Sequence, residues 1–165
     1  MFELHTNSIF DTFTGEAVVG PLRQAGVTLE QASTVTTTWG EWKATYPESF
    51  LIAQDGGIGR TYAENPLGSR DDNGPIFPIG ATDSRLSVQH PVIGVITGDG
   101  SPVAFDAEAA RANLAAGGTV ELSGVTLQAT GGGITAIDSD GAELPTHQAF
   151  WFAWSQFHPE TQLWS

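Results

Sequence analysis

The chain has 165 residues, which is long enough for one domain with its own hydrophobic core. Nineteen Asp and Glu residues against six Lys and Arg residues give a formal net charge of −13, so we expect neither nucleic acid nor an anionic membrane as a partner. There is no cysteine, which excludes disulfides and thiolate metal sites.

The first part of the chain is expected to contain short strands. Residues 2–13 should open with one strand, residues 17–19 begin a second, and residues 27–37 alternate as in a third. No run of about 18 apolar residues is present, so no membrane span is expected. Residues 1–5 lack the basic and apolar regions of a signal peptide. Scarce lysine with abundant acids is typical of high-salt proteomes, and a halophilic source is one interpretation.

The spacing of the apolar positions changes at Thr38, where a helix is predicted. Thr38 and Glu41 have the spacing of a capping box, in which each side chain bonds a backbone amide at a helix start. Trp39, Trp42 and Tyr46 follow at spacings of three and four residues, which places them on one helical face. The proline that comes next should end this helix.

Residues 54–91 form an irregular stretch of glycine, proline and charged residues. An irregular loop of this length inside a domain is commonly functional. Within it, residues 71–74 (DDNG) have the composition of a calcium loop without the ligand spacing of an EF-hand, so we expect an ordinary turn there.

The second part of the chain has clearer signals. Residues 92–105 predict a hairpin around the glycine-rich turn at 98–101, and Asp106 should cap an alanine-rich helix that ends near Gly117. These patterns predict an α+β fold, mainly antiparallel β with a few short helices. Three further strands are expected at residues 119–123, 125–130 and 133–138.

A fourteen-residue unit occurs twice. Residues 38–51 read TWGEWKATYPESFL and residues 150–163 read FWFAWSQFHPETQL, with two Trp residues, a Pro-Glu-Ser/Thr turn and a Leu at places 112 residues apart. Each copy predicts a helix, a proline turn and a short strand. The first of these strands is expected at residues 49–53 and the second from Thr161.

The repeat also predicts the organisation of the chain. We expect a single domain spanning residues 1–165, with half 1 at about 1–54, the irregular loop at 55–91 and half 2 at about 92–165. The pseudo-repeated helix–turn–strand units would hold equivalent places in two halves that share one core.

These segments resemble a family of uncharacterised bacterial and archaeal proteins, domain-of-unknown-function family 3179. Family members usually carry a further N-terminal hairpin segment and a Cys-Pro-x-Cys stretch, and this sequence begins after that region, so a thiol redox or soft-metal role does not carry over. The resemblance implies an extracytoplasmic or cell-envelope setting and no established biochemical role. It covers nearly the whole chain and rests on TFTGEAVVGPL, residues 83–86 (DSRL), PVIGV, DGSPVAF and the closing AFWFAWSQFHPET.

The four repeated tryptophans, Trp39, Trp42, Trp151 and Trp154, allow two interpretations. Stacked at an exposed cleft they would bind a flat ligand such as a sugar or, beside an arginine, hold a cation. Alternatively they are the twin centres of a pseudo-symmetric core, which the repetition of the whole unit favours.

A metal or acid–base site is a further candidate. Glu48 and Glu160 hold equivalent places in the two copies and could form an acid–base pair or share a divalent metal ion with His158. The alternative is that each carboxylate caps backbone amides of its own turn. No close histidine pair, nucleophile motif or phosphate loop is present, so no catalytic residue is assigned and no other cofactor is expected.

Arg60, Tyr62, Asp83 and Arg85 lie in the irregular loop of a chain that has few bases. Arginines grouped in such a loop could hold an anion or a carboxylate with two parallel hydrogen bonds. The alternative is that these residues form ion pairs that pin the loop to the body of the protein.

The leading hypothesis is a non-catalytic binding or interaction module. Its site for a protein partner or small ligand would lie near residues 55–90 and the aromatic repeats. Two alternatives stay open: a metal-dependent or acid–base hydrolase that uses Glu48, Glu160 and His158, and a structural subunit of an envelope assembly.

Overall fold

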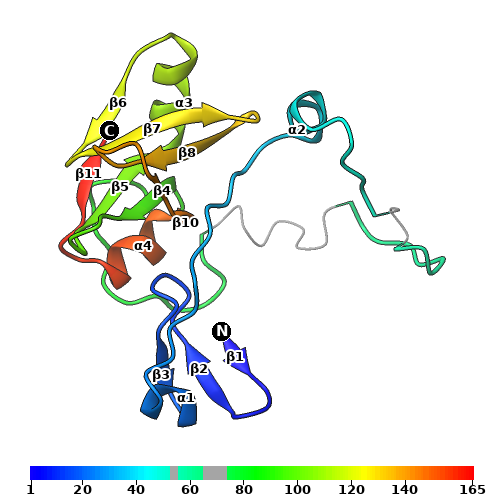
Figure 1. Ribbon diagram of the computed structural model, residues 1–165, viewed down its shortest axis with the longest axis vertical. Helices are drawn as coiled ribbons and strands as arrows, with labels where there is room; N and C mark the ends of the chain where they lie inside the picture. Colours follow the sequence, from blue (N-terminus) through cyan, green and yellow to red (C-terminus); the bar gives the residue numbers. More distant parts are fainter. Residues whose placement is uncertain (53–55, 65–73) are drawn as a thin grey trace.

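The computed structural model describes residues 1–52, 56–64 and 74–165. Within these ranges the predicted α+β fold is confirmed: the sheets are mainly antiparallel and the helices are short (Figure 1). The predicted turn at 71–74 lies outside the described residues, except for Gly74.

The strands of the described residues form three sheets. The N-terminal sheet precedes helix α1 (Pro21–Gln24) and contains β1 (Phe2–Glu3), β2 (Ser8–Phe10) and β3 (Ala17–Val19). The central sheet has the order β10-β4-β5-β11, with β4 at Pro91–Ile96, β5 at Pro102–Asp106, β10 at Thr146–Phe150 and β11 at Gln162–Trp164. The third sheet has the order β6-β7-β8-β9, with β6 at Val120–Leu122, β7 at Val125–Thr130, β8 at Gly133–Ile137 and β9 at Glu143–Leu144.

The longer helices begin where the sequence predicts them. Helix α2 (Trp39–Thr45) starts with the capping box of Thr38 and Glu41. Helix α3 (Ala107–Ala115) starts at Asp106, whose carboxylate accepts the amides of Glu108 and Ala109 at 2.9 and 3.0 Å. Helix α4 (Trp151–Phe157) begins directly after β10.

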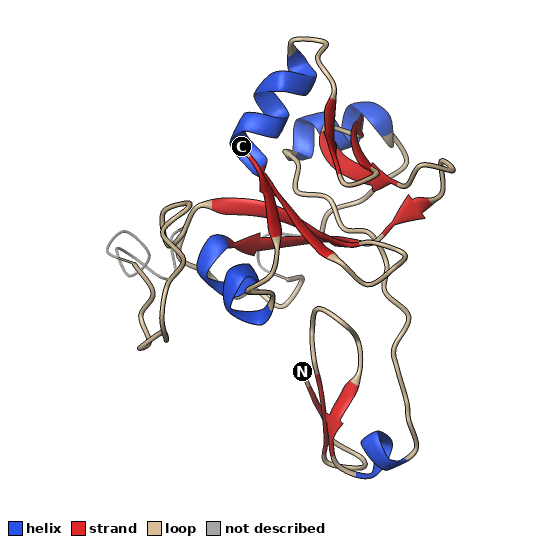
Figure 2. Ribbon diagram, turned by 90° about the vertical axis from the view of Figure 1, so that its left-hand side faces the viewer, coloured by secondary structure: helices blue, strands red, loops and turns tan. Residues whose placement is uncertain are grey.

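The hairpin β4–β5 is the centre of the molecule. Strand β10 pairs with β4 in antiparallel fashion, and β11 pairs with β5 in parallel fashion. Because α4 connects β10 to β11, the three elements form a split β-α-β unit with the hairpin between its two strands (Figure 2). We call residues 146–164 the second repeat unit and the corresponding residues 34–52 the first repeat unit.

The hydrophobic core surrounds this hairpin on both faces. One buried cluster joins β4 and β5 to α3 and the third sheet, and the other joins them to α4. Trp151 and Trp154 of α4 are fully buried in the second cluster. Apart from Phe10 and Ala17, the fully buried apolar side chains of the described residues all lie between Val92 and Trp154.

Two predicted strands are wrong. Residues 27–37 are extended but contribute only an isolated bridge between Glu16 and Thr28, and residues 49–52 of the expected strand at 49–53 form no strand. Both segments have apolar or β-branched residues that favour extended backbone, but a strand also needs a neighbour to pair with. The expected hairpin at 92–105 and the strands after Gly118 are confirmed.

The packing of Trp154 on Gly94 predicts a large effect of one methyl group. A Cβ at Gly94 would lie 2.3 Å from carbons of the Trp154 ring. We expect Gly94→Ala to lower the free energy of unfolding by about 1–3 kcal/mol, the usual cost of overpacking, in urea denaturation. At Gly98 an added Cβ meets no atom within 4 Å, so Gly98→Ala should change stability by less than about 0.5 kcal/mol. Equal effects of the two variants would contradict the described packing.

Candidate functional site

The two repeat units contain the same internal hydrogen bond. The indole N–H of Trp42 donates to the Ser49 hydroxyl at 2.9 Å, and the indole N–H of Trp154 donates to the Thr161 hydroxyl at 2.9 Å. In each case the acceptor lies seven residues after the tryptophan, beyond the proline turn. In each unit the bond therefore connects the segment after the proline turn to the helix that precedes the turn.

The backbone at the helix ends of the two units is also the same. Tyr46 ends α2 with φ −122° and ψ 74°, and His158 ends α4 with φ −129° and ψ 70°. The ring of each of these residues lies 4.3 Å, centroid to centroid, from the indole of its own unit. The sequence repeat is therefore a structural repeat.

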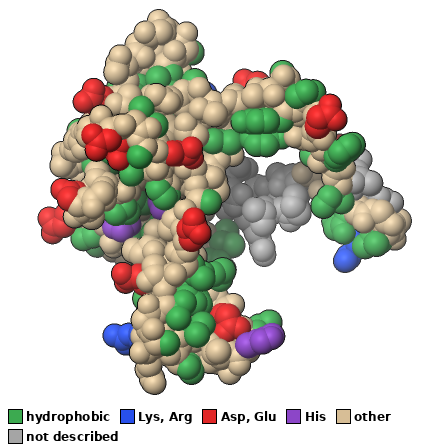
Figure 3. Space-filling model, in the orientation of Figure 1, with side chains coloured by type: hydrophobic (Ala, Val, Ile, Leu, Met, Phe, Trp, Pro, Cys, Tyr) green, Lys and Arg blue, Asp and Glu red, His purple; other side chains and the backbone are tan. Residues whose placement is uncertain are grey.

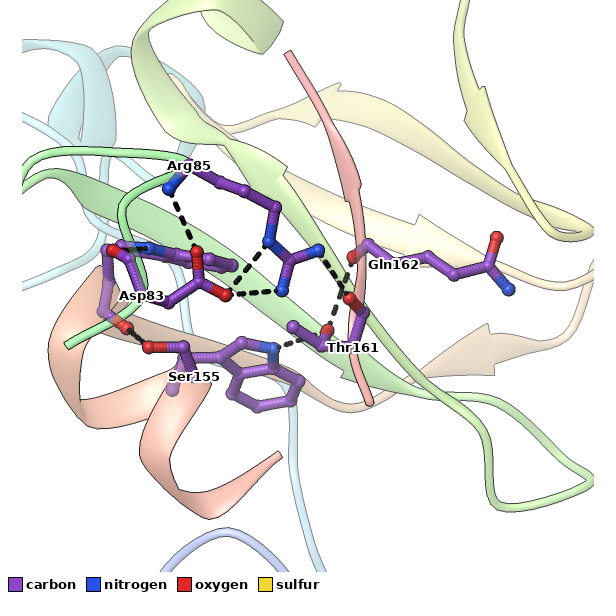
Figure 4. Close-up of polar contacts among 7 residues, drawn as sticks. Asp83, Arg85, Ser155, Thr161 and Gln162 are labelled. Carbon is purple, nitrogen blue, oxygen red and sulfur yellow. Dashed lines mark hydrogen bonds and ion pairs between the residues drawn. The ribbon is translucent and has the colours of Figure 1, made fainter. Parts of the chain in front are cut away.

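A basic side chain occupies the equivalent place in both units, although the two side chains come from different parts of the chain. In the second unit, the Arg85 guanidinium donates to the Thr161 carbonyl at 2.8 Å and lies 5.0 Å from the centre of the Trp151 ring (Figure 4). In the first unit, the Lys43 ammonium donates to the Ser49 carbonyl at 2.8 Å and lies 5.7 Å from the centre of the Trp39 ring.

The helix starts differ in what caps them. In α4 the amides of Trp151 and Phe152 donate to the carbonyls of His90 and Val88, at 2.8 and 3.0 Å. In α2 the Thr38 hydroxyl accepts the Glu41 amide, and the Glu41 carboxylate accepts the Thr38 amide. This bonding lowers the pKa of Glu41, with the Thr38 hydroxyl as the first cause. The first unit thus makes within itself the contacts that the second unit takes from residues 83–90.

The two units differ most in their packing. Trp151 and Trp154 are fully buried, and β11 adds to the central sheet. In the first unit Trp39 is 40% exposed, and residues 50–52 pair with no strand among the described residues. Phe50, Leu51 and Ile52 are 92%, 65% and 86% exposed. Apolar side chains gather on the part of the surface that includes α2 (Figure 3).

The turn between β7 and β8 holds the first unit in place. The Thr37 hydroxyl donates to the Gly131 carbonyl at 3.2 Å. A Cβ at Gly132 would lie 2.4 Å from the Cβ of Glu41, and one at Gly133 would lie 2.5 Å from the Cβ of Val35. Glycine at these places lets the backbone of the turn approach the first unit closely.

A pair of equivalent residues connects the two units directly. The Thr146 hydroxyl donates to the Thr34 carbonyl at 2.9 Å, and the Thr34 hydroxyl donates to the Thr146 carbonyl at 3.4 Å. The two repeat units therefore contact each other through residues that hold equivalent places in the repeat.

The predicted arginine site is divided between two places. Arg85 binds the Asp83 carboxylate with two hydrogen bonds of 2.9 and 2.7 Å, and this bonding is the first cause of a lowered pKa of Asp83. Together with the bond to Thr161, this geometry fits the alternative that the pair pins its segment to the body. Arg60 lies over the Tyr62 ring at 5.7 Å from its centre in residues 56–64, which Figure 1 shows at the right, away from the sheets. Anion binding by these four residues stays a prediction.

The predicted metal and acid–base residues do not converge. Glu48 and Glu160 are exposed and belong to the two units, which Figure 1 shows apart. His158 packs against the Trp154 and Phe13 rings. Within the described ranges, no group of three or more His, Asp or Glu residues is placed to hold a metal ion. A metal site at His158, Glu160 and Glu48 stays a prediction.

Phe13 is an important residue that the sequence did not indicate. It follows the N-terminal strands β1 and β2, and its ring makes edge contacts with several rings of the second repeat unit. These are His147, Trp154, Phe157 and His158, at centroid distances of 5.6, 5.4, 5.0 and 5.8 Å. No periodic pattern surrounds Phe13, so only the folded structure reveals this role.

The two units provide an internal comparison for mutagenesis. Trp154→Ala removes a fully buried ring and should lower the free energy of unfolding by about 3–5 kcal/mol. Trp42→Ala removes an equivalent but partly exposed ring, and we expect less than about half of that loss. Chemical denaturation of both variants checks this. Similar losses would show that the first unit is packed as tightly as the second.

The histidines beside Phe13 predict a pH dependence of stability. Burial lowers the pKa of His147 and of His158 below the ordinary value of 6.5; His158 lowers that of His147 further, and Asp11 opposes both shifts. Between the folded pKa and 6.5 the unfolded chain binds more protons, so stability should be constant above pH 6.5 and fall as the pH drops below it.

Urea denaturation between about pH 7.5 and about pH 5.5 measures this slope. The double variant His147→Gln/His158→Gln should flatten it. His5→Gln, which changes an exposed side chain, should leave the slope unchanged. A slope that survives in the double variant would assign the pH dependence to other groups.

The comparisons with known proteins agree with the sequence resemblance. No curated protein matches the chain, and no solved structure does. No helix within the described residues is both long and apolar enough to cross a membrane. The family model described as "Protein of unknown function (DUF3179)" matches residues 1–141, which is most of the chain. The chain therefore belongs to the DUF3179 family of proteins of unknown function.

Proposed function

We propose that the protein is a non-catalytic interaction module that binds another protein through its first repeat unit, residues 34–52. The observation that carries this proposal is the difference between two equivalent units in one chain. The second unit buries its tryptophans and adds its last strand to a sheet, whereas the first unit has the same internal bonds and exposes its apolar residues. The family resemblance adds an extracytoplasmic setting to the proposal.

Three exposed apolar residues of the first unit, Phe50, Leu51 and Ile52, are consecutive in the sequence. Single exposed apolar side chains are ordinary on a protein surface, but a contiguous patch is typical of an interaction site. Fully burying a Phe, Leu or Ile side chain contributes roughly 1.5–3 kcal/mol each. Covering Phe50, Leu51 and Ile52 together would therefore contribute on the order of 5 kcal/mol before the costs of association.

The backbone of the first unit supports the same proposal. Residues 34–38 are extended and have alternating exposure, as a strand has, and they pair with no strand of the described chain. Free strand edges present rows of amides and carbonyls that bind another strand. A protein partner satisfies these groups and the apolar side chains together, whereas a small ligand covers only part of this surface.

No specific observation in the described part of the chain favours the hydrolase alternative. A hydrolase needs a nucleophile or activated water within hydrogen-bonding reach of a base. The hydroxyl of Ser155 donates to the Trp151 carbonyl at 2.7 Å inside the core. Ser155 also lines a cavity of about 460 Å³, together with Asp83, Gln156 and Pro159, among others, and the Asp83 carboxylate is bound by Arg85.

Position-specific photo-crosslinking tests the proposal. A benzophenone-bearing phenylalanine analogue would replace Phe50 in the organism that encodes the protein, and a matched sample would carry it at Phe2, which is 54% exposed on β1. We expect a discrete crosslinked product from position 50 and none of the same mass from position 2. The absence of a product from position 50, or the same product from both positions, would reject the first unit as the binding surface.

A further inference from the structure

We infer that a cavity beside helix α3 binds a small amphiphilic carboxylate, with Arg111 holding the carboxylate and the cavity holding the apolar part of the ligand. The cavity has a volume of about 470 Å³ and is lined by residues of β4, β10 and α3, together with Thr36 of the first repeat unit. This inference goes beyond the proposed function and does not depend on it, because most of the residues that would hold the ligand belong to the central sheet and α3.

The inner end of the cavity is apolar. Val92 and Ala107 line it and are 1% and 3% exposed, so this end lies against the hydrophobic core. Pro91 and Ala149 also line it and are partly buried. Pockets for small molecules commonly measure about 300–1,000 Å³ and combine apolar walls with a few polar groups. An apolar group that enters this cavity leaves water, which favours its binding.

The rim of the cavity has hydrogen-bond donors. Thr36, Arg111 and Gln148 line the cavity and are exposed, and Phe150 adds an aromatic side chain beside them. A hydroxyl, a guanidinium and an amide can all donate to an oxygen of a ligand. A ligand whose apolar part lies at the inner end would therefore place a polar group at the rim, where these donors are.

Arg111 gives the rim a positive charge in a chain that has six basic residues against nineteen acidic ones. Among the described residues, its guanidinium forms no ion pair and no hydrogen bond, whereas that of Arg85 is bound to Asp83. The planar guanidinium matches a carboxylate, which it can bind with two parallel hydrogen bonds. Arg111 can therefore bind the carboxylate of a ligand without breaking a contact in the described part of the chain.

The acidic residues around Arg111 favour a ligand with a single negative charge. Hydrogen bonds from Thr38 are the first cause of the lowered pKa of Glu41, and the charge of Arg111 adds to this shift. Asp106 and Glu108 lie at the start of the same helix as Arg111. A phosphate dianion would bring a second negative charge toward these carboxylates, and like charges repel one another. A carboxylate has one charge and fits better.

The cavity of about 460 Å³ beside α4 does not combine these features. Among the described residues that line it, Asp83 is the charged one, and Ser155 and Gln156 are polar. Arg85 donates two hydrogen bonds to the Asp83 carboxylate. A negatively charged ligand is therefore expected at Arg111 and not in the cavity beside α4.

Titration of the full chain with octanoate, followed by amide NMR spectra, tests the inference. We expect saturable shifts of the amides of Val92 and of residues 107–111 and 148–150, with an affinity in the millimolar range or tighter for a ligand of this size. Arg111→Gln should raise the Kd at least about tenfold, because a hydrogen bond to a charged group contributes at least this factor. Arg111 is exposed, so we expect this variant to keep the fold.

Matched controls separate the charge from the apolar part. Arg23→Gln removes the same charge from α1, which Figure 1 shows at the opposite end of the molecule from α3, and should leave the Kd unchanged. Octanamide has the size and the apolar chain of octanoate but no charge, and acetate has the carboxylate but no such chain. Each should bind at least about tenfold more weakly than octanoate.

The results distinguish the inference from simpler kinds of binding. Saturable shifts at these segments, with affinity lost in Arg111→Gln and kept in Arg23→Gln, support it. The absence of a saturable shift, an unchanged affinity of Arg111→Gln, or an equal loss in both variants overturns it. Equal binding of octanamide or of acetate also overturns it, as do shifts centred on residues 50–52. The crosslink at position 50 tests only the interaction module, so either proposal can fail without the other.

Discussion

The contact between Trp154 and Gly94 is the constraint on which the rest of the structure depends. The indole lies against the backbone of β4 because residue 94 has no side chain, and its N–H donates to Thr161. A buried indole N–H needs an acceptor, and Thr161 supplies it at the point where the chain turns into β11. The Phe13 ring makes an edge contact with the same indole, so the N-terminal segment packs against the body of the protein at this place too.

Comparison of the two repeat units distinguishes the structural effects of local hydrogen bonds from those of burial against a sheet. The capping box of Thr38, the bond from Trp42 to Ser49 and the bond from Lys43 to Ser49 all form although residues 34–38 and 50–52 pair with no strand among the described residues. Together with the contacts of the β7–β8 turn, they accompany a helix and a helix end with the same backbone as in the second unit. They do not bury Trp39 or make residues 50–52 a strand, since both results need a sheet to pack against.

This separation explains what could be predicted from the sequence. The helix starts at Thr38 and Asp106 and the hairpin at 92–105 are encoded by residues close in sequence, and all three are confirmed. The strands expected at 27–37 and 49–53 failed because strand formation depends on partners elsewhere in the chain or outside it. The parallel pairing of β11 with β5, the contacts of Phe13 and the equivalent roles of Arg85 and Lys43 join segments whose spacing gives no signal. The candidate site follows the same rule: the sequence shows that a unit is repeated, and only the structure shows that one copy is exposed.

An exposed apolar strand in a free protein normally promotes self-association. Here the net charge of −13 opposes the approach of a second copy, since like-charged molecules repel one another in dilute salt. The self-contained capping of α2 and the bond from Thr37 to Gly131 preserve the shape of the first unit before any partner binds. Less ordering entropy is then lost on association, which favours a specific protein partner over non-specific contact. The acidic surface thus opposes self-association, and the preformed helix reduces the entropy that is lost when the specific partner binds.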